Sequence, residues 1–178
     1  MPKYVAFLRA INVGGHIVKM ERLRRLFEEM GFSNVETFIT SGNVIFDSSS
    51  KSTAAIEKKI EKYLEAKLGY AVVTFVRSTA AVAKLAGYDA FPKENRDGIT
   101  LYIGFLTEPL SKQTVENLYG AATELDLFHV RDTELFWLCR AQKLSDSKFL
   151  GPLLERTLGA RTTLRNANTI RRLAAKYQ

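Results

Sequence analysis

The chain has 178 residues, of which 46% are hydrophobic and 25% charged, so it is long enough to bury a core and lacks the composition of a disordered protein. The single Cys139 excludes an internal disulfide, and with only His16 and His129 beside it the chain has no Cys/His set of zinc-ligand spacing. No apolar run approaches the length of a membrane-spanning helix or of a signal peptide's hydrophobic region. We therefore expect a cytoplasmic protein with a formal net charge of +7, no metal, no cofactor and no membrane partner.

The first half of the chain predicts six elements in the order strand, helix, strand, strand, helix, strand. Runs of apolar and β-branched residues predict strands at residues 4–9, 35–40, 44–46 and 72–76. Apolar residues at helical spacing predict one helix that ends near Gly31 and another that ends at Gly69. The turn-forming tripeptide Ser41-Gly42-Asn43 predicts that the second and third strands form a hairpin.

The second half repeats this order after a bridging segment. A short helix at residues 79–86, stopped by Gly87, leads through an irregular stretch with Pro92 to the next strand. The strands of the repeat are predicted at residues 99–106, 127–131, 134–139 and 160–164. Its helices are predicted around residues 115–119 and 149–158, and one further helix carries Ile170, Leu173, Ala174 and Tyr177.

The repeated order predicts the fold class. A strand-helix-strand-strand-helix-strand unit is ferredoxin-like, with two helices on one face of a four-stranded antiparallel sheet. We expect an α+β protein with two such βαββαβ units in tandem, the first at residues 1–78 and the second, together with the extra C-terminal helix, at residues 98–178. Residues 79–97 are expected to join them with a bridging helix and loop. Several strands are apolar on both faces, so the second face of each sheet is expected to pack on the sister sheet, a bridging element or another subunit. Monomer and homodimer both stay open.

The loop between the first strand and the first helix is a candidate anion site. It contains Asn12, Gly14 and Gly15, and glycines let backbone N–H groups turn toward a ligand at a helix N-terminus. Arg9 and Lys19 would add positive charge. The glycine spacing fits neither the P-loop nor the dinucleotide fingerprint, and a tight connection alone would also explain the glycines.

The hairpin tip Ser41-Gly42-Asn43 is the second polar motif. A nucleophilic role for Ser41 would need a G-x-S-x-G elbow or a neighbouring base, and neither is visible in the sequence. A turn explains the tripeptide without further assumptions.

The third motif joins the last strand to the last helix. Asn166 is a candidate N-cap with Thr169 placed to bond back, and Arg165 offers a planar donor fork for a carboxylate or phosphate. Capping explains Asn166 and Thr169, but it explains Arg165 and Asn168 together less easily. The last 18 residues also hold five positive charges and no acidic residue, which favours either contact with phosphates or a solvated helix face.

These motifs resemble those of a known family. The opening run Arg9-Ala10-Ile11-Asn12-Val13-Gly14-Gly15, the hairpin Thr40-Ser41-Gly42-Asn43-Val44-Ile45-Phe46 and the closing run Thr163-Leu164-Arg165-Asn166-Ala167-Asn168-Thr169 are similar to those of the bacterial domain of unknown function 1697. Ala10 stands where that family commonly has Gly. The resemblance implies a small cytosolic α+β protein with ferredoxin-like halves and no established activity or cofactor. Because polar motifs lie at both ends of the chain, it also implies one shared site.

The functional prediction is therefore binding of a phosphate-bearing anion, either a nucleotide or nucleic acid, in a basic cleft between the two units. The alternatives are an enzyme acting on a small anionic substrate, although no catalytic constellation is recognisable, and a protein-interaction module without catalysis. The predicted ligand-binding residues are Arg9, Asn12, Gly14, Gly15, Lys19, Ser41, Gly42, Asn43, Arg165, Asn166, Asn168 and Thr169.

Overall fold

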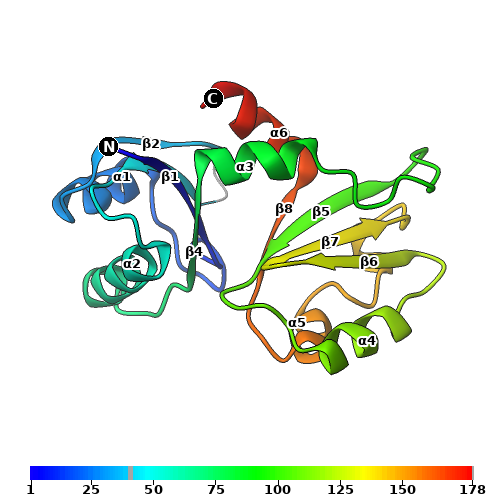
Figure 1. The fold of residues 1–178 in the computed structure, drawn as a ribbon. Coiled ribbons are helices and arrows are strands. Elements are labelled where there is room, and N and C mark those ends of the chain that lie inside the picture. Colours follow the sequence, from blue (N-terminus) through cyan, green and yellow to red (C-terminus); the bar gives the residue numbers. More distant parts are fainter. Residues whose placement is uncertain (40–41, 178) are drawn as a thin grey trace. The chain divides into compact units, whose positions relative to one another are not determined.

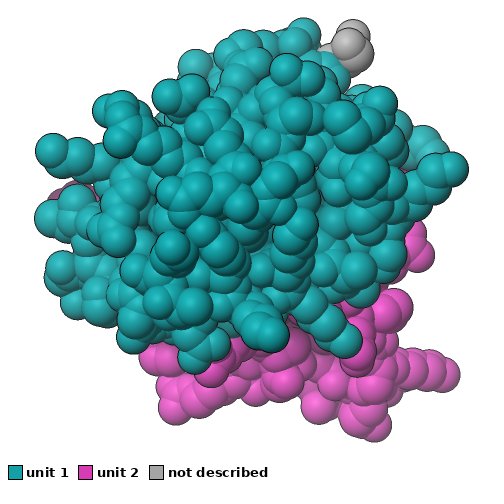
Figure 2. Space-filling model, turned by 90° about the vertical axis from the view of Figure 1, so that its left-hand side faces the viewer, with its two compact units in different colours: residues 1–85, 172–178 teal, residues 86–171 magenta. Residues whose placement is uncertain are grey.

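The computed structural model describes residues 1–39 and 42–177, and Figure 1 shows them as an α+β protein with two four-stranded antiparallel sheets. The chain divides into two compact units, coloured separately in Figure 2. Unit 1 comprises Met1–Leu85 and Arg172–Gln178, and unit 2 comprises Ala86–Arg171. None of the described helices is long and apolar enough to cross a membrane.

Unit 1 contains the six elements expected from the first half of the sequence. They are β1 (Lys3–Leu8), α1 (Met20–Glu29), β2 (Ser33–Thr37), β3 (Asn43–Asp47), α2 (Thr53–Leu68) and β4 (Thr74–Ser78). The strand order is β2-β3-β1-β4, and each neighbouring pair is antiparallel. Strand β4 starts later than predicted because its first residue, Thr74, pairs with Leu8, the last residue of β1. It also runs on beyond the predicted end, to the polar residue Ser78.

The core of unit 1 lies between this sheet and the two helices α1 and α2. Alternate side chains of β1, Ala6 and Leu8 among them, belong to the same apolar cluster as Phe27 of α1 and Ile60 of α2. The intervening side chains of Val5 and Phe7 are also buried. Gly31 ends the first helix region with a left-handed φ of +85°, as its position in the sequence predicts.

Unit 2 repeats the order of elements. The helix α3 (Thr79–Gly87) precedes this unit, and only its last two residues belong to it. The elements of unit 2 are β5 (Thr100–Phe105), α4 (Lys112–Gly120), β6 (Asp126–Arg131), β7 (Glu134–Cys139), a 3-10 turn η1 (Leu144–Asp146), α5 (Pro152–Leu158) and β8 (Thr163–Asn166). The strand order β6-β7-β5-β8 matches that of unit 1 position for position. The last helix, α6 (Ala167–Lys176), begins in unit 2, and its residues from Arg172 onward belong to unit 1.

The core of unit 2 packs one face of its sheet against α4 and α5. Trp137 of β7, Leu118 of α4 and Leu154 of α5 share one buried cluster. A buried carboxylate supports this core from β6. Asp126 Oδ1 accepts hydrogen bonds from Trp137 Nε1 at 2.9 Å and from Ser147 Oγ at 2.7 Å.

Two boundaries in unit 2 differ from the sequence prediction. The helix α5 begins at Pro152 and not at residue 149, because Gly151 adopts a φ of +86°, which a right-handed helix cannot contain. Phe149 still packs in the core, with its ring centroid 4.8 Å from that of Phe128. Strand β8 is displaced toward the C-terminus and ends at Asn166, where α6 begins without an intervening loop.

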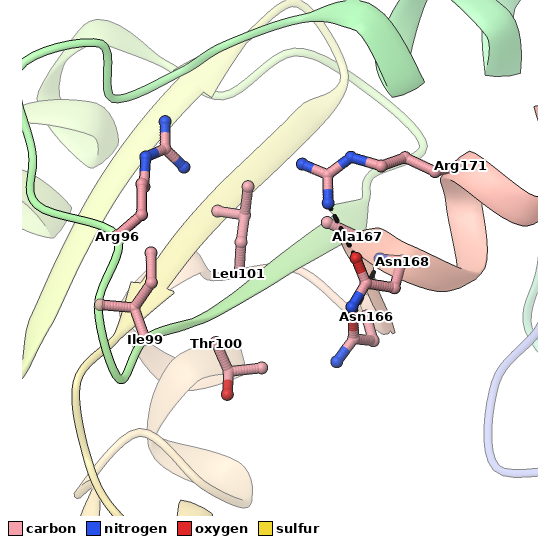
Figure 3. A pocket seen from close by; sticks show the side chains of 8 residues that line it. All are labelled: Arg96, Ile99, Thr100, Leu101, Asn166, Ala167, Asn168 and Arg171. Atoms are coloured by element: carbon pink, nitrogen blue, oxygen red, sulfur yellow. Dashed lines mark hydrogen bonds between the residues drawn. The ribbon is translucent and has the colours of Figure 1, made fainter.

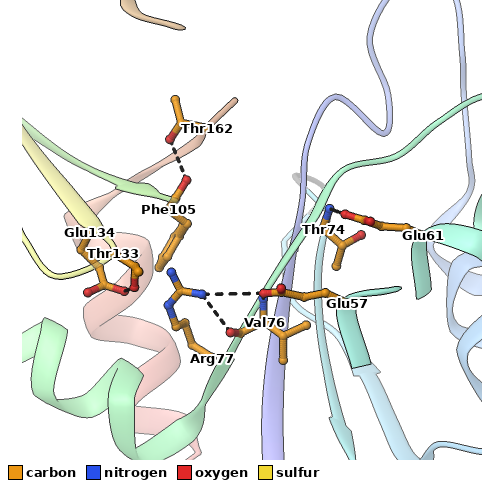
Figure 4. Close-up of polar contacts among 9 residues, drawn as sticks. All are labelled: Glu57, Glu61, Thr74, Val76, Arg77, Phe105, Thr133, Glu134 and Thr162. Carbon is orange, nitrogen blue, oxygen red and sulfur yellow. Dashed lines mark hydrogen bonds and ion pairs between the residues drawn. The ribbon is translucent and has the colours of Figure 1, made fainter. Parts of the chain in front are cut away.

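Polar side chains also bind backbone groups within each unit (Figure 4). In unit 1, Glu57 Oε1 accepts a hydrogen bond from Val76 N at 2.8 Å and lies 3.8 Å from Arg77 Nη1. In unit 2, Thr162 Oγ1 donates to the carbonyl oxygen of Phe105 at 2.9 Å.

Candidate functional site

A polar hollow of about 270 Å³ lies in unit 2 beside the first turns of α6 (Figure 3). The loop before β5, the start of β5, the end of β8 and the beginning of α6 all contribute to its wall. The lining residues are Arg96, Ile99, Thr100, Leu101, Asn166, Ala167, Asn168 and Arg171. We call this the first hollow. It brings together residues about 70 positions apart in the sequence.

Strand pairing places Asn166 in the wall, and Asn168 follows on the first turn of α6. Because β8 pairs antiparallel with β5, Asn166 lies opposite Tyr102, close to the start of β5. Asn166 Oδ1 accepts a hydrogen bond from Asn168 N at 2.9 Å. The first N–H groups of a helix have no partner within the helix, so this bond satisfies one of them. The capping role predicted for Asn166 is confirmed.

Arg171 supplies positive charge to the first hollow. Its Nη1 donates to Asn168 Oδ1 at 2.8 Å, and the two residues lie three positions apart on α6. Among residues 1–39 and 42–177, no carboxylate lies within salt-bridge distance of Arg171. Its neutral partner leaves the guanidinium charge available to an anion in the hollow.

Arg96 faces Arg171 from the other side of the first hollow. In Figure 3 the two guanidinium groups lie on opposite sides of Leu101. Arg96 forms an ion pair with Asp89, and its Nη2 also donates to the carbonyl oxygen of Phe91 at 3.0 Å. The residues that line the first hollow thus include two arginines and no acid.

A second hollow of about 300 Å³ adjoins the first. It shares Arg96, Leu101 and Arg171 and adds Ala86, Gly87, Tyr88 and Asp89. The first two added residues form the C-terminal end of α3, and the other two begin the loop that follows.

Tyr88 is held in place by contacts with β6. Its hydroxyl oxygen lies 2.9 Å from His129 Nε2, and the Arg131 guanidinium lies 4.4 Å from the centre of its ring. Burial and the nearby charge of Arg131 lower the pKa of His129, which favours the neutral imidazole. Among the described residues, no group of three His, Cys, Asp or Glu side chains is arranged to bind a metal ion.

The predicted ligand-binding residues in unit 2 divide into two kinds. Asn166 and Asn168 line the first hollow. Arg165 and Thr169 are not among the lining residues of either hollow. Arg165 is only 7% exposed, its Nη1 donates to Thr163 Oγ1 at 2.7 Å and to the carbonyl oxygen of Leu164 at 3.0 Å, and burial lowers its pKa to about 10.

The glycine loop of unit 1 is held in a defined conformation by the side chain of Asn12. Asn12 Oδ1 accepts from Val18 N at 2.7 Å, so the Asn12 side chain ties the two ends of the loop together. Gly14 and Gly15 have left-handed φ values of +68° and +85° and are exposed. Lys19 is the exposed N-cap residue of α1, and Arg9 is half-buried.

The described part of the hairpin tip is buried. Gly42 has a φ of +76°, and a Cβ there would approach Ile11 Cγ2 to 2.8 Å, so the position requires glycine. Asn43 is fully buried, and its Nδ2 donates to the carbonyl oxygen of Phe38 at 2.9 Å. Ser41 lies outside the described residues. That these loops share one cleft with the Arg165 corner stays a prediction.

The polar residues Tyr88, Asp89 and Arg96 line the hollows, although the sequence does not predict them as ligands. They lie in the irregular stretch after α3, where no periodicity marks a functional side chain. In the sequence, Arg171 is distinguished only as one charge of the basic C-terminal segment. The positive charge of Arg96, in the stretch that the sequence predicts to join the two units, is the signal that points to it.

Comparison with known proteins identifies the family. The family model described as "Protein of unknown function (DUF1697)" matches residues 1–136, about three quarters of the chain. The chain belongs to the DUF1697 family. The resemblance noted in the sequence is thereby confirmed.

A solved structure has the same fold as this DUF1697 member. It is described as a conserved bacterial protein from Streptococcus pneumoniae, and its sequence is 24% identical to this chain. The two structures superpose with a TM-score of 0.76, and the match covers 99% of this chain and 98% of the other. No curated protein matches the chain. The stretch of this DUF1697 chain that matches the family model includes Tyr88, Asp89 and Arg96 but ends before Asn166.

Proposed function

We propose that unit 2 binds a small molecule carrying a phosphate group, with the phosphate in the first hollow. The observation that carries this proposal is Arg171, whose charge has only the neutral side chain of Asn168 beside it among the described residues. Arg96 adds a second guanidinium on the opposite side of the same hollow. Planar guanidinium groups form paired, charge-assisted hydrogen bonds to phosphate oxygens.

The other lining groups suit the same anion. The side-chain amide groups of Asn166 and Asn168 and the hydroxyl group of Thr100 can donate hydrogen bonds. The N-terminal end of α6 carries a partial positive charge, which adds to the attraction of an anion but is not sufficient to bind one. Together these groups supply charge and direction for an anion with several oxygens.

The size of the hollow favours a small ligand over a polymer. A volume of about 270 Å³ is near the lower limit for small-molecule sites. Nucleic acid, the other phosphate source, would make several phosphate contacts, and its affinity would fall steeply with salt. We therefore favour a small phosphate compound over nucleic acid as the ligand. The salt dependence of the binding affinity distinguishes the two.

Isothermal titration calorimetry with inorganic phosphate at low ionic strength tests the proposal. Arg171→Ala removes the unneutralised charge and is expected to weaken phosphate binding about tenfold, which corresponds to about 1.4 kcal/mol. Asn168→Ala should weaken it less, because it removes a neutral donor and leaves the charge.

The matched control is Arg156→Ala, which removes an exposed arginine on α5 in the same unit. It should leave phosphate affinity unchanged, so that a general loss of positive charge is excluded. The proposal fails if the wild-type protein binds no phosphate, or if both arginine variants weaken binding equally.

We also infer that each unit has the ferredoxin-like topology. The support is the shared element order and the shared strand order, in which the first strand lies between the third and the fourth. Both sheets are antiparallel throughout.

A further inference from the structure

The second hollow differs from the first in its hydrogen-bonding character. Asp89 Oδ1 is engaged by Arg96 and accepts from Phe91 N at 3.0 Å, whereas its Oδ2 has no hydrogen-bond partner among the described residues. Ala86 and Gly87 lie at the end of α3, where the last carbonyl groups of a helix have no partner within it. The second hollow thus adds acceptors to the arginine donors that it shares with the first.

Charge decides which donor a ligand should present to these acceptors. The lining of the second hollow contains two arginines and one aspartate, so it stays net positive. An ammonium group placed there would be repelled by Arg96 and Arg171. A hydroxyl group can donate to Asp89 Oδ2 without that cost, and hydrogen bonds to a carboxylate are stronger than those between neutral groups.

Tyr88 adds an apolar wall of fixed orientation. Its hydroxyl is bound to His129, and its ring lies 5.2 Å, centre to centre, from that of Phe136. The part of this aromatic side chain that lines the hollow can pack against the C–H groups of a ligand. Carboxylate, carbonyl and ring together suit a compact compound with hydroxyl groups on a carbon skeleton.

The two hollows share Arg96, Leu101 and Arg171, so one ligand can occupy both. We infer that the ligand is a phosphate ester of a polyhydroxylated compound, such as a sugar phosphate, with its phosphate in the first hollow and its hydroxyl groups against Asp89 in the second. This inference rests on the proposed function, because it assumes that the phosphate occupies the first hollow.

Calorimetric titration of the wild-type protein with three matched phosphate esters tests the inference. Ribose 5-phosphate carries hydroxyl groups, ethyl phosphate carries none, and phosphoethanolamine carries an ammonium group. Ribose 5-phosphate should bind about tenfold more tightly than ethyl phosphate, as one charge-assisted hydrogen bond allows. Phosphoethanolamine should bind no more tightly than ethyl phosphate.

Asp89→Asn should abolish the preference for ribose 5-phosphate over ethyl phosphate. Asparagine keeps an acceptor for Phe91 N, so the local turn is retained, but it removes the charge that strengthens the hydroxyl contact. The readout is the ratio of the two affinities, because the freed Arg96 can change the affinity for every phosphate. Asp146→Asn, at an exposed aspartate of unit 2, is the control and should leave the ratio unchanged.

The outcomes separate this inference from the proposed function. Equal affinities for ribose 5-phosphate and ethyl phosphate, a preference for phosphoethanolamine, or an unchanged ratio in Asp89→Asn would overturn the inference and leave phosphate binding standing. Failure of all three esters to bind the wild-type protein would overturn both. Even if the Asp89→Asn variant does not fold, the affinities of the wild-type protein for the three esters test the inference.

Discussion

At the scale of single residues, burial separates side chains that the sequence presents as equivalent. Arg165 and Arg171 lie in the same basic segment, yet Arg165 is 7% exposed and Arg171 is exposed and lines both hollows. Composition predicts that this segment is basic. It cannot tell which arginine faces solvent, because that depends on the pairing of β8 with β5.

Glu57 provides a test at this scale that is independent of ligand binding. It is 8% exposed, and burial raises its pKa above the ordinary 4.5, although the hydrogen bond from Val76 N and the charge of Arg77 oppose the change. The folded state therefore binds the Glu57 proton more tightly than the unfolded state does. This contribution to stability is fully present below pH 4.5 and is lost as pH rises through the folded-state pKa.

We expect Glu57→Gln, which keeps the acceptor for Val76 N, to gain stability relative to wild type as pH rises above 4.5. Urea unfolding of both proteins from pH 4 to 8 measures the difference in the free energy of unfolding. Glu61→Gln is the control, since Glu61 also accepts a backbone N–H, from Thr74. A difference for Glu57→Gln that does not change with pH would contradict the assignment.

At the scale of elements, apolar periodicity predicts most of the fold. The spacing of Leu23, Leu26 and Phe27 predicts α1 because those residues form one buried face. The same signal misplaces the start of α5, since Phe149 and Leu150 continue the period although Gly151 has a φ that ends any helix. The 3-10 turn at Leu144–Asp146 has too few residues to produce a period at all.

The two glycine turns of unit 1 should respond differently to substitution. Gly42→Ala combines a left-handed φ with a Cβ only 2.8 Å from Ile11 Cγ2, so it should lower the free energy of unfolding by about 3 kcal/mol. Gly14→Ala has the same backbone strain but no atom within 4 Å of the added Cβ, and should cost about 1 kcal/mol. Thermal unfolding of both variants measures this, and equal losses would show that packing at Gly42 contributes nothing.

At the scale of the whole molecule, the sequence predicts two of the residues in the candidate site. Asn166 and Asn168 stand out because they lie where the last strand passes directly into the last helix. Arg96, Asp89 and Tyr88 reach the hollows only because the loop after α3 lies beside the start of β5 and the end of β8. Their positions depend on the fold of unit 2, and no local pattern in the chain encodes such a position.

The central claim is that the first hollow holds a phosphate group between Arg96 and Arg171. A crystal structure of the wild-type protein grown with inorganic phosphate, from crystals in which neither arginine touches a neighbouring molecule, tests it most directly. We predict tetrahedral density within hydrogen-bond distance of the Arg171 guanidinium and the Asn168 side chain. An empty first hollow in a crystal that binds phosphate elsewhere would contradict the account.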